Sequence, residues 1–191
     1  IGVNVKDGAT ITAGGAGQVN VTGTGGITTG GANHGVLVQE SNATITSSGG
    51  AVTVTGLGGG NTNSSLNIGV LVNSSGKITA GGNGDVHVTG DGGVLGVLNT
   101  GIQVSGTGST IFSEVGDIFI TANGGGNSTT PSFGLEVSQA GKITSTNSAD
   151  ITIMANGGLS NAASNQYGFY LEGPVSEVTS VDGVISITAN G

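Results

Sequence analysis

The segment Gly35-Val36-Leu37-Val38 recurs in altered form along the whole chain, as a glycine followed by a short apolar run. The spacings between successive glycines are 33, 34, 32, 33 and 34 residues. Their positions are Gly2, Gly35, Gly69, Gly101, Gly134 and Gly168. An internal period in this range is typical of architectures in which equivalent units stack on one another. The repeat therefore predicts the fold, whereas it says less about function because the residues it fixes belong to the core.

Each repeat carries further apolar positions at fixed or nearly fixed distances from its glycine. Nine or ten residues on come Ile11, Ile45, Ile78, Ile111, Ile143 and Val178. Seventeen residues on come Val19, Val52, Val86, Ile118, Ile151 and Ile185. The variation in repeat length falls almost wholly in the segment that returns from this last position to the next glycine. A constant part and a variable part predict a structural frame with one adjustable loop.

Three short strands are predicted in each repeat. The apolar positions are β-branched and alternate with polar residues, as in Ala51-Val52-Thr53-Val54-Thr55, a pattern typical of strands. The 41 glycines disfavour helix throughout. We therefore expect an all-β fold, a single right-handed parallel β-helix (β-solenoid) over residues 1–191, with about six coils of 32–34 residues and three strands per coil. With equivalent strands about 4.8 Å apart, six coils rise roughly 29 Å.

The alternation also assigns the two faces of each strand. We expect Val, Ile and Leu to stack inside in like-on-like columns, and residues such as Thr53 to point outward. Glycines fill the predicted corners, as in Thr22-Gly23-Thr24-Gly25-Gly26, and we attribute them to the positive φ that sharp corners need. No capping segment is evident at either end, so we expect a section of a longer array whose partners are neighbouring β-helical repeats of the same parent protein.

Composition limits the partners. The formal net charge is −8, with 11 acidic residues against three lysines and no arginine. No nucleic-acid partner is expected, because affinity for phosphate backbones comes mainly from cationic groups. The sequence contains no signal peptide and no transmembrane run, and we expect no membrane insertion. The absence of cysteine fits both an extracellular protein and a reducing cytosol, so it does not decide the compartment.

Runs of glycine, asparagine, serine and threonine surround the alternating Val and Ile residues along the whole chain. In this pattern and composition the chain resembles the repeat regions of very large bacterial surface adhesins, in the style of the haemagglutinin-like secreted proteins of Gram-negative bacteria. The resemblance implies an elongated, exported rod, extracellular at the bacterial cell surface or associated with the outer membrane. Its role would be to project or mediate attachment to a partner cell surface or glycan. We therefore expect a non-enzymatic structural or adhesive segment.

Three aspartates form the candidate metal site. Asp85, Asp117 and Asp150 stand sixteen residues after the glycine in three consecutive repeats. Carboxylates stacked about 4.8 Å apart repel by roughly 1 kcal/mol in water and by about 3 to 4 kcal/mol at an effective dielectric constant of 20. Bound Ca²⁺ would remove this repulsion, and it takes carboxylate oxygens as ligands. The alternative is a column of solvated carboxylates that binds no ion.

Two further kinds of polar column are predicted. Asn123, Asn156 and Asn190 share one position in the last three repeats, and we expect their amides to form a structural ladder. Outward threonines recur beside the second and third strands: Thr12, Thr46, Thr79, Thr144 and Thr179, and Thr22, Thr55, Thr89, Thr121 and Thr188. Several ice-binding proteins order water on such columns, so an ice-binding threonine face is one alternative function. Phe112 and Met154 interrupt the two columns.

A carbohydrate-binding or polysaccharide-degrading β-helix domain is the other alternative. Glycan hydrolysis needs clustered carboxylates with an acid or base nearby. The two histidines lie at different positions of coils two apart: we expect His34 at the edge of the core and His87 on the surface beside Asp85. We assign no catalytic residue and no organic cofactor.

The variable return segments are the expected place for binding specificity, because repeat proteins carry binding residues on loops along one side of the frame. These segments run from Ile27 to Asn33, Asn61 to Asn67, Val94 to Asn99, Asn127 to Ser132 and Leu159 to Gln166. For any single loop, the alternative is a spacer whose sequence is free to drift.

Overall fold

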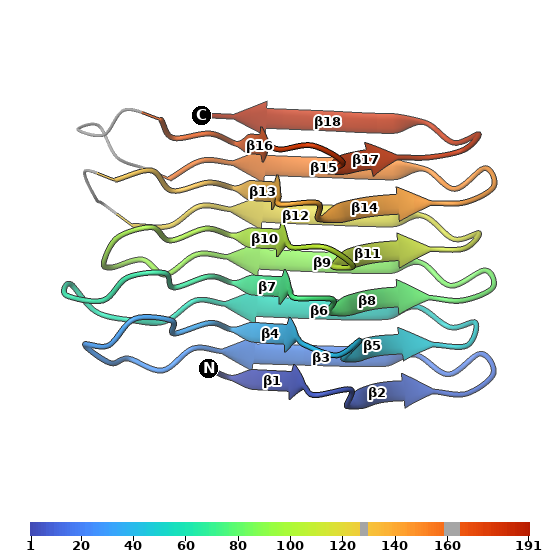
Figure 1. The fold of residues 1–191 in the computed structure, drawn as a ribbon, viewed down its shortest axis with the longest axis horizontal. Coiled ribbons are helices and arrows are strands. Elements are labelled where there is room, and N and C mark those ends of the chain that lie inside the picture. Colours follow the sequence, from blue (N-terminus) through green and yellow to red (C-terminus); the bar gives the residue numbers. More distant parts are fainter. Residues whose placement is uncertain (127–129, 159–164) are drawn as a thin grey trace.

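The computed structural model describes residues 1–126, 130–158 and 165–191, and these residues form a parallel β-solenoid (Figure 1). The strands are β1 (Val3–Lys6), β2 (Thr10–Ala13), β3 (Val19–Thr24), β4 (Val36–Gln39), β5 (Thr44–Ser47), β6 (Val52–Leu57), β7 (Val70–Asn73), β8 (Lys77–Ala80), β9 (Val86–Asp91), β10 (Ile102–Ser105), β11 (Thr110–Ser113), β12 (Ile118–Asn123), β13 (Leu135–Ser138), β14 (Lys142–Ser145), β15 (Ile151–Asn156), β16 (Phe169–Leu171), β17 (Glu177–Thr179) and β18 (Ile185–Asn190).

Three parallel sheets of six strands run along the stack. The first sheet has the order β1-β4-β7-β10-β13-β16, the second β2-β5-β8-β11-β14-β17, and the third β3-β6-β9-β12-β15-β18. The chain makes five complete turns between Gly2 and Gly168, and a sixth rung of three strands follows. The predicted right-handed parallel solenoid with three strands per coil is confirmed, with five full turns and a sixth rung in place of six coils.

Pairing between rungs keeps equivalent residues side by side. In the third sheet, for example, Val52 pairs with Val86 and Val54 with Val88, and the same register continues along the stack. The inward residues form one continuous apolar core, in which most Val and Ile side chains of the middle rungs have no exposed surface. Like-on-like columns follow because parallel strands at constant spacing place identical positions directly above one another.

The recurrent glycine lies where the start of a first-sheet strand crosses the end of the third-sheet strand in the same rung. A Cβ atom on Gly69 would lie 2.5 Å from the backbone nitrogen of Asp91 and 2.6 Å from the carbonyl oxygen of Gly101. The nearest backbone atom to a Cβ on any of the other five glycines lies at 2.3 to 2.6 Å. None of the six has a positive φ. The repeat therefore keeps glycine because two backbones pass too close for a side chain.

Two glycines of the quoted corner have a similar cause, and our attribution of Gly23, Gly25 and Gly26 to positive φ is wrong, whereas Gly60 and Gly126 after β6 and β12 do have positive φ. Gly23, Gly25 and Gly26 have no positive φ, and a Cβ on either of the first two would meet backbone atoms at 2.2 or 2.1 Å. Left-handed residues occur in other turns, including Asp7 (φ 57°) and Gly8 (φ 77°) between β1 and β2. Tight crossing of the chain, rather than a special dihedral angle, therefore selects glycine at positions 23 and 25.

The substitution Gly69→Ala tests this cause. We expect it to lower the free energy of unfolding by about 3 kcal/mol, because the added methyl group overpacks against backbone that cannot move independently. Gly14→Ala is the matched control, since a Cβ there meets nothing within 4 Å and its φ is not positive. Urea unfolding followed by circular dichroism measures both. Equal losses in the two variants would contradict the crossing argument.

Candidate functional site

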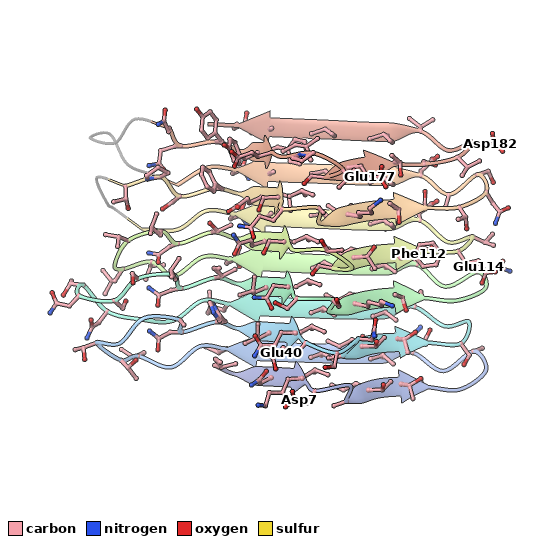
Figure 2. The ribbon with its side chains drawn as sticks, in the orientation of Figure 1. Asp7, Glu40, Phe112, Glu114, Glu177 and Asp182 are labelled. Carbon is pink, nitrogen blue, oxygen red and sulfur yellow. The ribbon has the colours of Figure 1, made fainter. Side chains whose placement is uncertain are left out.

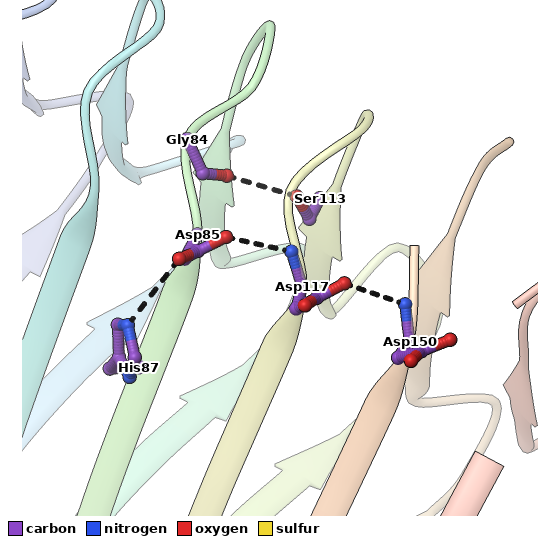
Figure 3. Close-up of polar contacts among 6 residues, drawn as sticks. All are labelled: Gly84, Asp85, His87, Ser113, Asp117 and Asp150. Carbon is purple, nitrogen blue, oxygen red and sulfur yellow. Dashed lines mark hydrogen bonds and ion pairs between the residues drawn. The ribbon is translucent and has the colours of Figure 1, made fainter. Parts of the chain in front are cut away.

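The three aspartates predicted as a column do line up on one corner, immediately before β9, β12 and β15 (Figure 3). Each carboxylate accepts a hydrogen bond from a backbone amide of the next rung. The Asp117 amide donates to Oδ1 of Asp85 at 2.9 Å, and the Asp150 amide donates to Oδ1 of Asp117 at 2.9 Å. The Val184 amide donates to Oδ1 of Asp150 at 2.7 Å. One oxygen of every carboxylate thus joins two rungs.

The second oxygen of each carboxylate is the one that remains for other partners. Oδ2 of Asp85 lies 4.0 Å from Nε2 of His87, and both side chains are more than two-fifths exposed. The His87 ring stacks on Phe119 of the next rung, with ring centroids 4.7 Å apart and planes 10° from parallel. His87 is therefore a surface residue beside the column, as expected (Figure 3).

The described ranges 1–126, 130–158 and 165–191 contain no group of three or more His, Cys, Asp or Glu side chains arranged to hold a metal ion. In the aspartate column, backbone amides already supply part of the compensation that we assigned to a cation. Calcium at Asp85, Asp117 and Asp150 stays a prediction, and any ion there would use the oxygens that the amides leave free.

His34 lies at the edge of the core, as expected, with 5 % of its surface exposed. The backbone amide of Ile68 donates to its Nδ1 at 3.4 Å. Burial, with a smaller contribution from the charged N-terminus, lowers the pKa of His34 to about 4. The imidazole is therefore neutral at pH 7 and acts as an acceptor between rungs.

The predicted asparagine ladder is present in the described residues and extends one rung further than expected. The side-chain amide of Asn190 donates to Asn156 at 2.9 Å, and that of Asn156 donates to Asn123 at 2.8 Å. Asn123 donates in turn to Oδ1 of Asp91 at 2.7 Å. The ladder runs along the ends of the third-sheet strands and ties four rungs together.

A second, buried ladder was missed by the sequence analysis. Asn33 donates to Asn67 at 2.9 Å and Asn67 donates to Asn99 at 2.9 Å, with 5 %, 0 % and 0 % of their surfaces exposed. Backbone amides then continue the column, from Asn99 to Ser132 Oγ at 3.3 Å and from Ser132 to Gln166 Oε1 at 3.1 Å. All five residues stand two positions before a recurrent glycine, which is the signal that could have revealed them.

The buried ladder gives the last residue of each return loop a structural role. Each segment expected to carry specificity ends on a ladder residue, so its last position is structural. The exposed residues of the first three loops include Ile27 and Val94, with 85 % and 74 % of their surfaces exposed. Residues 127–129 and 159–164 of the last two loops lie outside the described residues.

The second sheet carries a depression on its outer face that the sequence analysis did not identify as a site. It has a volume of about 520 Å³ and lies over β8, β11 and β14. The lining residues include Lys77, Thr79, Thr110, Phe112, Lys142 and Thr144. Phe112 occupies the column position held by Thr79 and Thr144 in the adjacent strands. The signal in the sequence was the interruption of a threonine column by one aromatic residue.

Comparisons with protein-family models, with curated proteins and with solved structures found no match to this chain. Within the described residues, no helix is long and apolar enough to cross a membrane. Arguments about function therefore depend on the geometry of the chain itself.

The aspartate column predicts different outcomes for two substitutions of its middle member. Asp117→Ala leaves the Asp150 amide without its acceptor and should lower the free energy of unfolding by about 1 kcal/mol. Asp117→Asn keeps an oxygen at the same place and should stay within about 0.5 kcal/mol of the parent. Denaturant unfolding of the three proteins checks the order. A column with no structural role would leave the alanine and asparagine variants alike.

The same proteins test the calcium prediction. If the column binds Ca²⁺, millimolar calcium should raise the melting temperature of the parent chain above its value in chelator, because a ligand that binds only the native state stabilises it. Asp117→Asn should remove most of that rise. Equal melting temperatures with calcium and with chelator in both proteins would show that the column acts through its backbone hydrogen bonds alone.

His34 predicts a dependence of stability on pH. Its folded-state pKa lies below the unfolded value near 6.5, so the unfolded chain takes up a proton first as pH falls. The neutral imidazole makes its full contribution to the free energy of unfolding above about pH 6.5. As the pH falls to about 4, that contribution is lost progressively, by roughly 3 kcal/mol in total. His34→Ile, which matches Ile68 in the next rung, should lack this loss.

Urea midpoints of the parent and the His34→Ile variant between pH 4 and pH 7 measure the effect. The two proteins differ only at residue 34, so the difference between the two curves isolates His34. Parallel curves over this window would contradict the assignment.

Proposed function

We propose that this chain is a non-enzymatic structural or adhesive rod segment of a large exported bacterial surface protein of the haemagglutinin-like type. It would lie outside the cell, at the bacterial surface or associated with the outer membrane, and project or mediate attachment. The observation that supports this most is the constant register of three parallel sheets, with equivalent residues paired from rung to rung. Such a frame can lengthen by adding rungs without changing any existing contact.

Neighbouring β-helical repeats of the same parent protein are the partners that we propose for the ends of the stack. Within the described residues, β18 pairs with β15 along one edge, and its Ile185 and Ile187 show 39 % and 42 % of their surfaces. A further rung in the same register would pair with the other edge of β18 and cover these side chains.

The surfaces along the stack support contact with a partner cell surface or a glycan. The first three return loops lie on one side of the stack (Figure 1) and expose apolar side chains such as Ile27 and Val94. The depression on the second sheet adds a concave surface in the size range of small-molecule sites. These features favour binding through the flanks while the stacked sheets provide stiffness.

The two alternatives draw different support. Carbohydrate binding is favoured by the depression and its aromatic residue, and it is compatible with an adhesive role. An ice-binding face has less support, because Phe112 and Met154 break the threonine columns and lysines occupy the neighbouring second-sheet positions 77 and 142. The hydroxyl groups of Thr46 and Thr79 also bond to each other, at 2.8 Å.

Two deletions in the parent protein test the rod role. Removing residues 35–68 takes out one whole repeat and rejoins His34 to Gly69, so equivalent strands still pair. We expect this variant to reach the cell surface, resist protease and support attachment at close to the parental level. Removing residues 35–51 deletes two strands of one rung and should abolish folding, because the register of three sheets is lost together.

Antibodies raised against the chain should label intact cells that make the parent protein or the whole-repeat deletion. Failure of the antibodies to label intact cells would contradict the proposed location at the cell surface. Loss of attachment in a whole-repeat variant that is still displayed and protease-resistant would show that the segment carries a specific site in that repeat, not a rod.

A further inference from the structure

We infer that the depression on the second sheet binds an acidic sugar, a uronate unit of a polysaccharide. The inference goes beyond the rod role by naming a ligand class and a site. It can be measured on the purified chain, so its failure would leave the rod role untouched, and failure of the rod role would leave the binding site in place.

Charge is the first argument. The chain has a net charge of −8 and only three lysines, and two of them, Lys77 and Lys142, line this one depression. Both are paired in register with Thr110, one on each side, so their backbones lie about 10 Å apart. In an otherwise acidic molecule, two cations at one concave surface favour an anionic ligand.

The two lysines differ in what already neutralises them. Lys142 Nζ lies 2.5 Å from Oε1 of Glu177 on β17, so part of its charge is compensated. Lys77 takes part in none of the ion pairs found within residues 1–126, 130–158 and 165–191. An incoming carboxylate would therefore meet Lys77 as its main cation, with Glu177 as a competitor for Lys142.

The aromatic residue is the second argument. Phe112 is half-buried and lines the depression, and its register partners on both sides are Thr79 and Thr144. Figure 2 shows Phe112 on β11 and Glu177 on β17 on the same face of the stack. A pyranose ring has C–H groups on one face that can lie on a phenyl ring, and edge hydroxyls that can bond to threonine oxygens.

The two arguments together select a uronate. A simple inorganic anion would use the lysines but gain nothing from the phenyl ring, and a neutral sugar would use the ring and hydroxyls but leave Lys77 without a partner. A sugar that carries a carboxylate satisfies both. The volume of about 520 Å³ accommodates an oligosaccharide segment rather than a single ion.

Titration calorimetry of the full chain with trigalacturonate, at low salt and with chelator present, tests the inference. Lys77→Thr and Phe112→Thr each restore the residue of the neighbouring rungs, so the fold should be kept. We expect each to weaken binding about fivefold or more. Glu177→Gln should strengthen binding by about threefold, because it frees Lys142. Lys6→Gln, which removes an equal charge on the first sheet, is the control and should leave the affinity within about twofold.

Further ligands separate the chemical classes. Sulfate, or a neutral trisaccharide, should bind at least tenfold more weakly than trigalacturonate. Absence of measurable trigalacturonate binding at millimolar concentration would overturn the inference. So would equal affinity for sulfate with no effect of Phe112→Thr, which would leave a simple anion site, or equal affinity for the neutral sugar with no effect of Lys77→Thr.

Discussion

The structure depends on one constraint: every turn must return to the same height above the last, so that all three sheets stay hydrogen-bonded at once. Two paired parallel strands cannot shift their register locally when the same rung supplies strands to two other sheets. The recurrent glycines mark the place where this demand is most severe, because the first and third strands cross there with room for hydrogen atoms only. The apolar columns, both asparagine ladders and the aspartate column all follow from the constant height that this crossing maintains.

Much of the fold could be predicted from the sequence because equivalent positions of successive repeats become neighbours in the stack. The positions of Val52, Val86 and Ile118 at one offset were enough to predict a column, and the column exists. The reason for the glycines could not be predicted, because a close crossing and a positive φ both select the same residue. Only the three-dimensional path of the chain separates the two causes.

The candidate sites were predicted less completely. The offset of Asp85 and Asp117 predicted that the carboxylates stack, but not that each would accept the next rung's amide, since that depends on how the corner presents its N–H groups. The depression joins Lys77 to Lys142 across 65 residues of sequence, and each lysine alone resembles an ordinary surface residue. Phe112 was noticed only as a fault in a threonine column, although such a departure from a repeat is where a site can be built.

Each of the two asparagine ladders has its own donor-to-acceptor direction along the stack. In the outer ladder each asparagine donates toward the N-terminal rung, and the series ends on Asp91, whose ionised carboxylate has acceptors but no donors. In the buried ladder Asn33 and Asn67 donate the opposite way, toward the C-terminal rung. The side-chain dipoles of the two series therefore point in opposite directions along the axis. A single acceptor-only residue fixes the orientation of every amide above it, so the choice made at one rung is transmitted through three others.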